Sequence, residues 1–506
     1  MQSSGKIFWA SFLTLIAAGV GFAIRGKVLG EWGSAFGFTK TDLGTITGGG
    51  LVGMAFTIIG FSLFADRVGY KLILIGAFLL HVLSAVVTLA ATSVYESMGQ
   101  NATYWCLYIG MFMFSLANGM CEAAINPLVA TLYPKQKTHY LNILHAGWPG
   151  GLIVGGLLAF AFVGESAKIS FLRWEIPMMF FLVPTLWYGV IVLKEKFPIS
   201  EARAAGVKFA DMLAEFAAPI LLFLLFLHAL VGYVELGTDS WITNITQPKL
   251  QQIGIDSVLL LVYTAGLMFV LRFFAGPIVE RINPLGLLFV SAVLACIGLY
   301  SMGNVLGLFG DTEQQARAGW LLLGAATIYG IGKTFFWPTM LGVVGERFPK
   351  GGALAMGAMG GVGMFSAGLL GGPGIGYTQD VFASKKLEET NPAVYANVRS
   401  NEVNSFLFFG PVSGFDGSKV EKLREEKSPE YAPVELASDY GGQMALKVTA
   451  GIPAAMAVGY LLLLIYFRMI GGYKLVEIGP GGEERETPHR PTAKEAIYSD
   501  SQADQA

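Results

Sequence analysis

The sequence predicts an all-α membrane protein whose twelve transmembrane helices form two pseudo-symmetric six-helix bundles. Three observations support this fold class. The 506-residue chain is 54% hydrophobic and only 14% charged, whereas about a quarter of the residues in soluble domains are charged. Its apolar residues gather in stretches long enough to cross a bilayer. Finally, the two halves of the chain repeat one short motif at equivalent places.

Twelve stretches of about 20 apolar residues, the length that spans a hydrocarbon core, can be placed in order. They are expected at 7–27, 44–65, 71–92, 104–132, 139–163, 173–193, 217–241, 256–279, 285–309, 319–346, 351–376 and 444–470. An N-terminal bundle over 1–193 is thus joined by a polar linker, 194–216, to a C-terminal bundle over 217–470. A polar loop at 377–443 interrupts the second bundle. The Gly-, Glu- and Pro-rich tail at 471–506 is predicted to be disordered.

The orientation follows from basic residues in the short loops, because Lys and Arg collect on the cytoplasmic side. One side holds most of them, including Lys71, Arg203 and Lys350. Both termini are therefore expected in the cytoplasm and the 377–443 loop outside. We expect a multi-pass protein of the plasma (inner) membrane, since nothing in the sequence suggests an organelle address.

The internal repeat lies between the second and third spans of each half. SLFADRVGYK, starting at Ser62, aligns without a gap with GPIVERINPL, starting at Gly276. Asp66 and Arg67 then match Glu280 and Arg281. An acid followed by Arg at a helix end is expected to make a charge-assisted bond across the short turn. Recurrence in both halves favours a gating role for these four residues over a chance surface ion pair.

The first copy resembles the G-x-x-x-D-R-x-G-R-K signature of the major facilitator superfamily of transporters. Asp66, Arg67, Gly69 and Lys71 match it, whereas Ser62 replaces the first glycine and Tyr70 a basic residue. The resemblance implies two six-helix bundles that rock about a site at mid-membrane. It also implies that the motif latches the cytoplasmic side.

Ionisable groups inside a span are costly and usually face a cavity or a partner. The fourth span carries Asn118, Glu122 and Asn126 four residues apart, hence on one face. The tenth span, its repeat equivalent, carries Tyr329, Lys333 and Trp337 at the same spacing, which aligns Glu122 with Lys333. In the superfamily these two helices face each other across the cavity. We therefore predict that Glu122 and Lys333 pair when no substrate is bound.

Further candidate binding residues lie on three other spans. They are His228, Glu235 and Asp239 in the seventh, Asn142, His145 and Trp148 in the fifth, and Arg25 late in the first, expected beside Lys333. Polar groups beside aromatic rings suit a hydroxyl-rich ligand. The alternative is that these polar residues bond neighbouring helices. His81 is expected to be a packing residue, and Arg272 to extend its charge toward the membrane surface.

A narrower resemblance comes from residues 118–156 and the seventh span. The order Glu122, Asn126-Pro127, Leu141-Asn142 and the spaced Gly147, Gly151 and Gly155 is similar to the fucose–proton symporter family, as is GYVELGTDSW around Glu235. This resemblance implies a sugar substrate, proton symport, and Glu122 as the protonatable acid. The family's founding permease has an acid near Gly26, where this chain has Arg25.

Two alternatives stay open: an organic-anion carrier for sugar acids, and a sensor that binds without transport. The small net charge of −2 does not favour nucleic acid. No phosphate-binding glycine loop, HExxH motif or clustered Cys/His spacing is present, so no enzyme, cofactor or metal site is expected. The expected partners are a sugar or sugar acid, a proton and the lipid bilayer, with the monomer as the functional unit.

Overall fold

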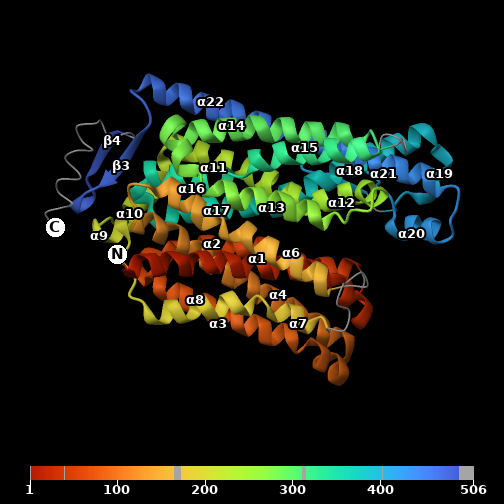
Figure 1. Ribbon diagram of the computed structural model, residues 1–506, viewed down its shortest axis with the longest axis horizontal. Helices are drawn as coiled ribbons and strands as arrows, with labels where there is room; N and C mark the ends of the chain where they lie inside the picture. Colours follow the sequence, from red (N-terminus) through yellow and green to blue (C-terminus); the bar gives the residue numbers. More distant parts are fainter. Residues whose placement is uncertain (1, 39, 164–172, 310–314, 402, 489–506) are drawn as a thin grey trace.

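The computed structural model describes residues 2–38, 40–163, 173–309, 315–401 and 403–488. Helices run parallel to the long axis of the molecule in two groups (Figure 1). The N-terminal half, red to yellow, packs along one side of the C-terminal half, green to blue. The linker helices α9 (Glu201–Ala204) and α10 (Phe209–Ala214) lie at one end with strands β3 (Lys474–Ile478) and β4 (Glu484–Pro488). We call this the hairpin end. The opposite end, which carries α19 (Pro392–Val398) and α20 (Gly417–Glu425), is the loop end.

The helices of the N-terminal half form the predicted spans, some of them in two pieces. They are α1 (Gln2–Phe36), α2 (Lys40–Val68), α3 (Tyr70–Leu89), α4 (Ala91–Leu132), α5 (Lys137–His145), α6 (Gly147–Phe162), α7 (Glu175–Met179) and α8 (Leu182–Lys194). The fifth span divides into α5 and α6 where the sequence reads Ala146-Gly-Trp-Pro149, because a proline cannot continue the helical hydrogen bonding.

The C-terminal half repeats this plan with additions. Its helices are α11 (Pro219–Gly232), α12 (Thr238–Gln252), α13 (Val258–Arg272), α14 (Ala275–Leu306), α15 (Gln315–Lys333), α16 (Phe336–Arg347), α17 (Gly352–Phe365), α18 (Gly372–Thr390), α19 (Pro392–Val398), α20 (Gly417–Glu425), α21 (Tyr431–Thr449) and α22 (Gly451–Met469). Single π-helical turns, Tyr233–Gly237 and Ser366–Gly371, join α11 to α12 and α17 to α18. Short 3-10 turns lie at Glu215–Ala217, Pro349–Gly351 and Pro480–Gly482.

Nine helical stretches of the described chain are long and apolar enough to cross a membrane. The other three predicted spans correspond to α2, to the 15-residue apolar helix α13, and to α15 with α16. All twelve predicted spans therefore coincide with helices. Large apolar side chains such as Phe56, Trp187 and Trp320 remain more than 60% exposed, as lipid-facing residues do.

Two predictions about the polar segments are wrong in part. The 377–443 segment is not simply a loop: α18 and α21 extend through it, α19 and α20 cap them, and Leu387, Val398 and Val434 form a small core. Residues 471–488 are not disordered, because β3 (Lys474–Ile478) pairs antiparallel with β4 (Glu484–Pro488). Residues 489–506 lie outside the described residues.

Candidate functional site

Polar side chains of the fourth and fifth spans form a chain in the N-terminal half. Asn126 Nδ2 donates to the Glu122 carboxylate at 2.8 Å and to its backbone carbonyl at 3.0 Å. His145 Nε2 lies 2.9 Å from Asn126 Oδ1, an acceptor, so this nitrogen is the donor. All three side chains are buried. His145 is the last residue of α5, and its carbonyl is presented where the helix breaks.

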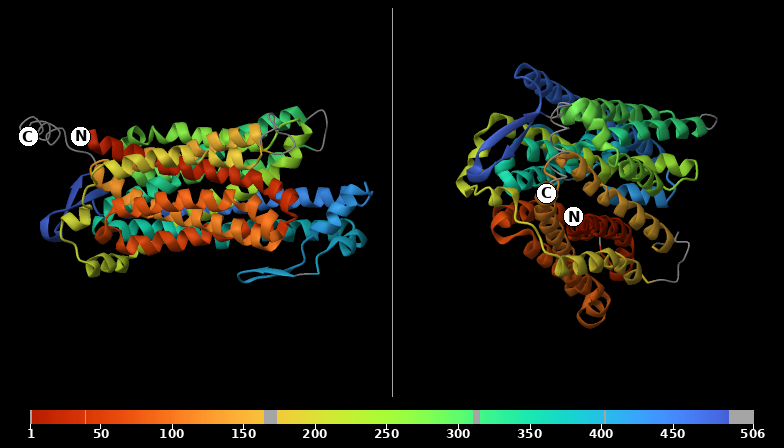
Figure 2. Two further views of the ribbon diagram at one scale, coloured as in Figure 1. Left: turned by 90° about the horizontal axis from the view of Figure 1, so that it is seen from below. Right: turned by 60° about the vertical axis from the view of Figure 1, so that its left-hand side comes forward.

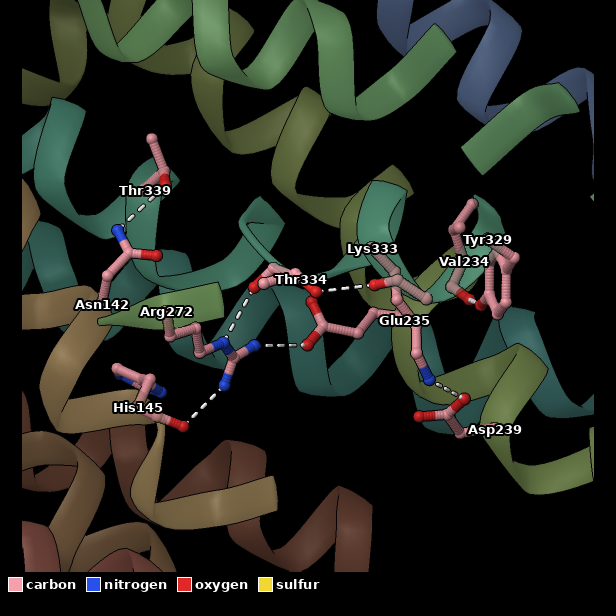
Figure 3. Close-up of polar contacts among 11 residues, drawn as sticks. Asn142, His145, Val234, Glu235, Asp239, Arg272, Tyr329, Lys333, Thr334 and Thr339 are labelled. Carbon is pink, nitrogen blue, oxygen red and sulfur yellow. Dashed lines mark hydrogen bonds and ion pairs between the residues drawn. The ribbon is translucent and has the colours of Figure 1, made fainter. Parts of the chain in front are cut away.

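Arg272, at the end of α13, joins this chain to the C-terminal half (Figure 3). Its NH1 donates to the carbonyl of His145 at 2.6 Å, its Nε to the carbonyl of Thr334 at 2.8 Å, and its NH2 to Glu235 at 3.1 Å. Only 1% of the residue is exposed. The expectation that Arg272 extends toward the membrane surface is therefore wrong, because it finds a full set of buried acceptors.

A second ion pair joins Asp239 of α12 to Lys333 at the end of α15. The aromatic ring of Tyr329 lies 5.2 Å from the Lys333 ammonium, and its hydroxyl donates to the carbonyl of Val234 at 2.9 Å. The predicted pairing of Glu122 with Lys333 is thus wrong in this structure. Asp239 lies on the same half as Lys333 and takes its place as partner, while Glu122 is bonded by Asn126.

These residues form what we call the central cluster: Glu122, Asn126, His145, Glu235, Asp239, Arg272 and Lys333. It spans both halves, and Arg272 also interacts electrostatically with Glu122 and Asp239. Three carboxylates face two cations in the described structure. Because each cation already pairs with one carboxylate, Glu122 is the acid left over.

Two predicted site residues instead lie inside the N-terminal half. Arg25 places its guanidinium carbon 3.4 Å from the centroid of Phe114 and 4.9 Å from that of Phe181, so it stacks on rings and does not lie beside Lys333. Asn118 accepts from His81 at 3.0 Å, and His81 also bonds Tyr188 at 2.8 Å. Both ring nitrogens of His81 thus have hydrogen-bond partners, as expected of a packing residue. Asn118 bonds a neighbouring helix, which is the alternative role considered for the polar residues of the spans.

The remaining candidates contact aromatic rings or the opposite half. His228 lies against Trp337, with ring centroids 4.6 Å apart. Asn142 donates to Thr339 of the other half at 3.1 Å. Trp148 packs on Phe22, with centroids 5.5 Å apart. Aromatic rings and an amide thus occur on the same predicted spans as residues of the central cluster, a combination that suits a polyhydroxylated ligand.

The first copy of the repeated motif contacts the opposite half directly. Asp66 Oδ2 accepts from the backbone N–H of Ala353 at 3.1 Å and Oδ1 from the hydroxyl of Tyr70 at 3.1 Å. A carboxylate at the start of α17 satisfies a free helix N–H and favours the positive end of the helix dipole. Asp66 therefore makes a charge-assisted bond across its own turn, to Tyr70, and in addition caps a helix of the other half. Arg67 lies over Phe209 of the linker, 5.3 Å from its ring centroid.

The second copy makes an analogous contact. The N–H of Gly276, which aligns with Ser62, donates to His139 Nδ1 of the N-terminal half at 3.0 Å. Ser62 approaches Gly357 so closely that a Cβ there would lie 1.8 Å from its hydroxyl oxygen. Glu280 and Arg281 are exposed, and Glu280 interacts electrostatically with His139. Both copies thus lie where the halves meet.

Other bonds close the hairpin end around Glu346. Its Oε1 accepts from the Thr138 hydroxyl of the N-terminal half at 2.6 Å, and its Oε2 from the Tyr473 hydroxyl at 2.8 Å. Burial and the Glu346 carboxylate raise the pKa of Tyr473 well above its usual value, which keeps this donor protonated. Lys137 donates to the carbonyl of Gly345 at 3.0 Å. The structure is therefore closed at the hairpin end.

Sequence reasoning assigned Arg272 a different role, and it predicted no site role for Thr334, Thr339 or Glu346. An arginine within an apolar span, with an unpaired acid such as Glu235 on the preceding helix, was the available signal. Within the described residues, no group of three or more His, Cys, Asp or Glu side chains could hold a metal ion.

Comparison with known proteins agrees with this architecture. The family model described as Major Facilitator Superfamily matches residues 8–372, while no curated protein sequence matches the chain. Among solved structures, the Escherichia coli fucose:proton symporter FucP is 14% identical with a TM-score of 0.58, covering 90% of this chain and 99% of its own.

Two other solved structures share the fold. The proton:xylose symporter XylE is 11% identical with a TM-score of 0.64, covering 98% of this chain and 99% of its own. The human organic anion transporter MFSD10 is 13% identical with a TM-score of 0.52, covering 90% and 99%. These identities are low and show the fold. The family model, which covers most of the chain, shows that this protein belongs to the major facilitator superfamily of membrane transporters.

Proposed function

We propose that this protein is a secondary active transporter that moves a small polar solute, a neutral sugar, together with a proton by alternating access. The observation that carries the proposal is the central cluster. It lies where the halves meet, is buried apart from the partly exposed Asp239, and has one carboxylate more than it has cations. A buried spare acid is costly when charged and gains from taking up a proton.

The charge balance favours a neutral substrate over a sugar acid. Arg272 and Lys333 each pair with a carboxylate of their own half, so an anionic ligand would have to displace Glu235 or Asp239. A neutral sugar can instead bond the amides and carboxylates, with an apolar ring face on Trp337 or Trp148. Arg25 adds no cation to the cluster, since it stacks on Phe114 within the N-terminal half.

Arg272 supplies a physical route for coupling. Its bond to the His145 carbonyl crosses between the halves and exists only while they are closed at this depth. Opening the hairpin end moves the His145 carbonyl away from Arg272 and changes the electrostatic potential that Arg272 produces at Glu122 and Glu235. A proton or sugar that binds more tightly in one state then shifts the equilibrium between states.

The similar solved structures named as fucose and xylose proton symporters support this choice, although their low identity establishes only the fold. The proposal places the hairpin end in the cytoplasm, both termini inside, and the protein in the plasma (inner) membrane as a functional monomer. The structure then represents a state closed toward the cytoplasm.

Uptake of a radiolabelled panel of neutral sugars and uronates into proteoliposomes, with and without an inward proton gradient, tests the proposal. We expect neutral-sugar uptake that the gradient raises, with a small effect of Arg25→Gln and a large loss in Glu122→Gln. Uptake of uronates alone would favour the organic-anion carrier instead. Binding without uptake would favour a sensor.

A further inference from the structure

A second β-hairpin, distinct from the β3–β4 hairpin, carries no charge and projects from the otherwise polar 377–443 segment at the loop end. Strand β1 (Asn404–Phe406) pairs with β2 (Phe409–Val412). No charged residue occurs from 403 to 415, although charged residues are frequent on both sides of this stretch. The left view of Figure 2 shows the light-blue hairpin folded back along the flank of the helices at this end.

The tip of this hairpin exposes large apolar side chains. The exposed fractions are 64% for Leu407, 87% for Phe408 and 51% for Phe409, with Val403 at 59%. Leu407 has a φ of 51°, a conformation that tight hairpin turns usually assign to Asn or Gly. A bulky apolar residue in this conformation costs free energy, and its exposure to water offers no compensating gain. We infer that the gain comes from contact with an apolar environment.

The base of the hairpin fixes its depth. Phe406 and Phe409 stack near Tyr377, whose hydroxyl donates to the carbonyl of Gly410 at 2.5 Å. Phe406 also lies against Gly374. Tyr377 follows about 25 residues after α17 begins at Gly352, slightly more than the roughly 20 residues that cross the hydrocarbon core. The hairpin therefore starts at the membrane–water boundary and turns back toward the bilayer.

We propose that this hairpin is a membrane anchor whose tip, formed by Leu407, Phe408 and Phe409, enters the interfacial region of the leaflet at the loop end. The tip is apolar and exposed, and the absence of charge means that no ionised group is desolvated on entry. Aromatic residues concentrate at this depth in membrane proteins. The anchor holds the first turns of α18 against the bilayer while the halves move.

Fluorescence quenching of the full chain in phosphatidylcholine nanodiscs tests this. The three native cysteines are replaced by alanine, and an environment-sensitive fluorophore is attached to Phe408→Cys. The matched control carries it on Glu425→Cys, an exposed position of α20 in the same segment. Nitroxide-labelled lipid should quench the probe at 408 and leave 425 unchanged, while an aqueous quencher should do the reverse.

A second variant addresses the apolar side chains themselves. Leu407→Asn with Phe408→Gly creates a favourable hairpin turn without an apolar tip, so a probe on Phe409→Cys should lose lipid quenching. Quenching of the fluorophore at position 408 by the aqueous quencher alone would overturn the proposal. Protection from both quenchers would also overturn it, since the tip would then dock on protein. Neither result depends on transport activity.

Discussion

Replacing Arg272 by lysine tests whether one side chain links the central cluster to the closed state. Lysine keeps the charge but cannot bond Glu235, Thr334 and His145 together, because its ammonium is a compact point donor and not a planar fork. A lysine that pairs with the nearest anion, Glu235, cannot also reach the His145 carbonyl. The 2.6 Å bond from Arg272 to that carbonyl, which joins the halves, is then lost.

A hydrogen bond from a charged donor contributes about 1.5–3 kcal/mol. Since this bond exists only with the hairpin end closed, its loss should shift the equilibrium toward the open state by roughly 10- to 150-fold. Electron–electron double resonance between spin labels on Gln136→Cys and Ile282→Cys, exposed positions near the hairpin end of each half, measures the two populations. The long-distance population should grow in Arg272→Lys.

The control is Arg317→Lys, an exposed arginine of α15 for which no shift is expected. Unchanged distance populations in Arg272→Lys, in protein that still folds and elutes as the parent does, would refute the argument. They would show that the bond to His145 contributes little to closure.

Three other predictions follow. Glu122→Gln should abolish proton-driven accumulation but retain counterflow exchange, measured in proteoliposomes; full accumulation would exclude Glu122 as the proton site. Lys333→Ala should lower stability by about 1–3 kcal/mol because the Asp239 carboxylate, 20% exposed, loses its partner, whereas Lys333→Met with Asp239→Asn should recover most of the thermal midpoint; equal losses would contradict this. Thr138→Val should weaken closure at Glu346 by about 1–3 kcal/mol, because the Thr138 hydroxyl bonds Glu346 across the halves; this should be seen as greater spin-label separation, and Glu477→Gln on β3 should have no effect.

The sequence predicts the spans well because length and apolarity decide which segments cross a bilayer. Breaks within them depend on local geometry: the divisions at Ala146 and between α15 and α16 place His145 and Lys333 at helix ends. The hairpin at 474–488 was missed because its order comes from tertiary contacts. These include Arg347 with the carbonyl of Lys474 at 2.8 Å and Lys350 with Glu484 at 3.5 Å.

The site is harder to predict than the fold. Some predicted residues, such as His145 and Glu235, do meet through Arg272 where the halves join, since charges in spans are seldom placed by chance. The sequence does not determine which acid pairs with which base, because pairing depends on the rotation of each helix about its axis, which residue spacing does not fix. Lys333 therefore pairs with Asp239 and not with Glu122. Arg25 packs within the N-terminal half, and Arg272 lies at the centre of the cluster.

The central claim, that a neutral sugar and a proton cross together through the Glu122 site, is tested most directly by substrate-driven proton movement. Proteoliposomes that enclose a pH-sensitive dye receive an outside pulse of neutral sugar, with no initial pH gradient. The account predicts acidification of the lumen by the parent protein and none by Glu122→Gln. Sugar uptake without any pH change in the parent would contradict the account and leave facilitated diffusion in its place.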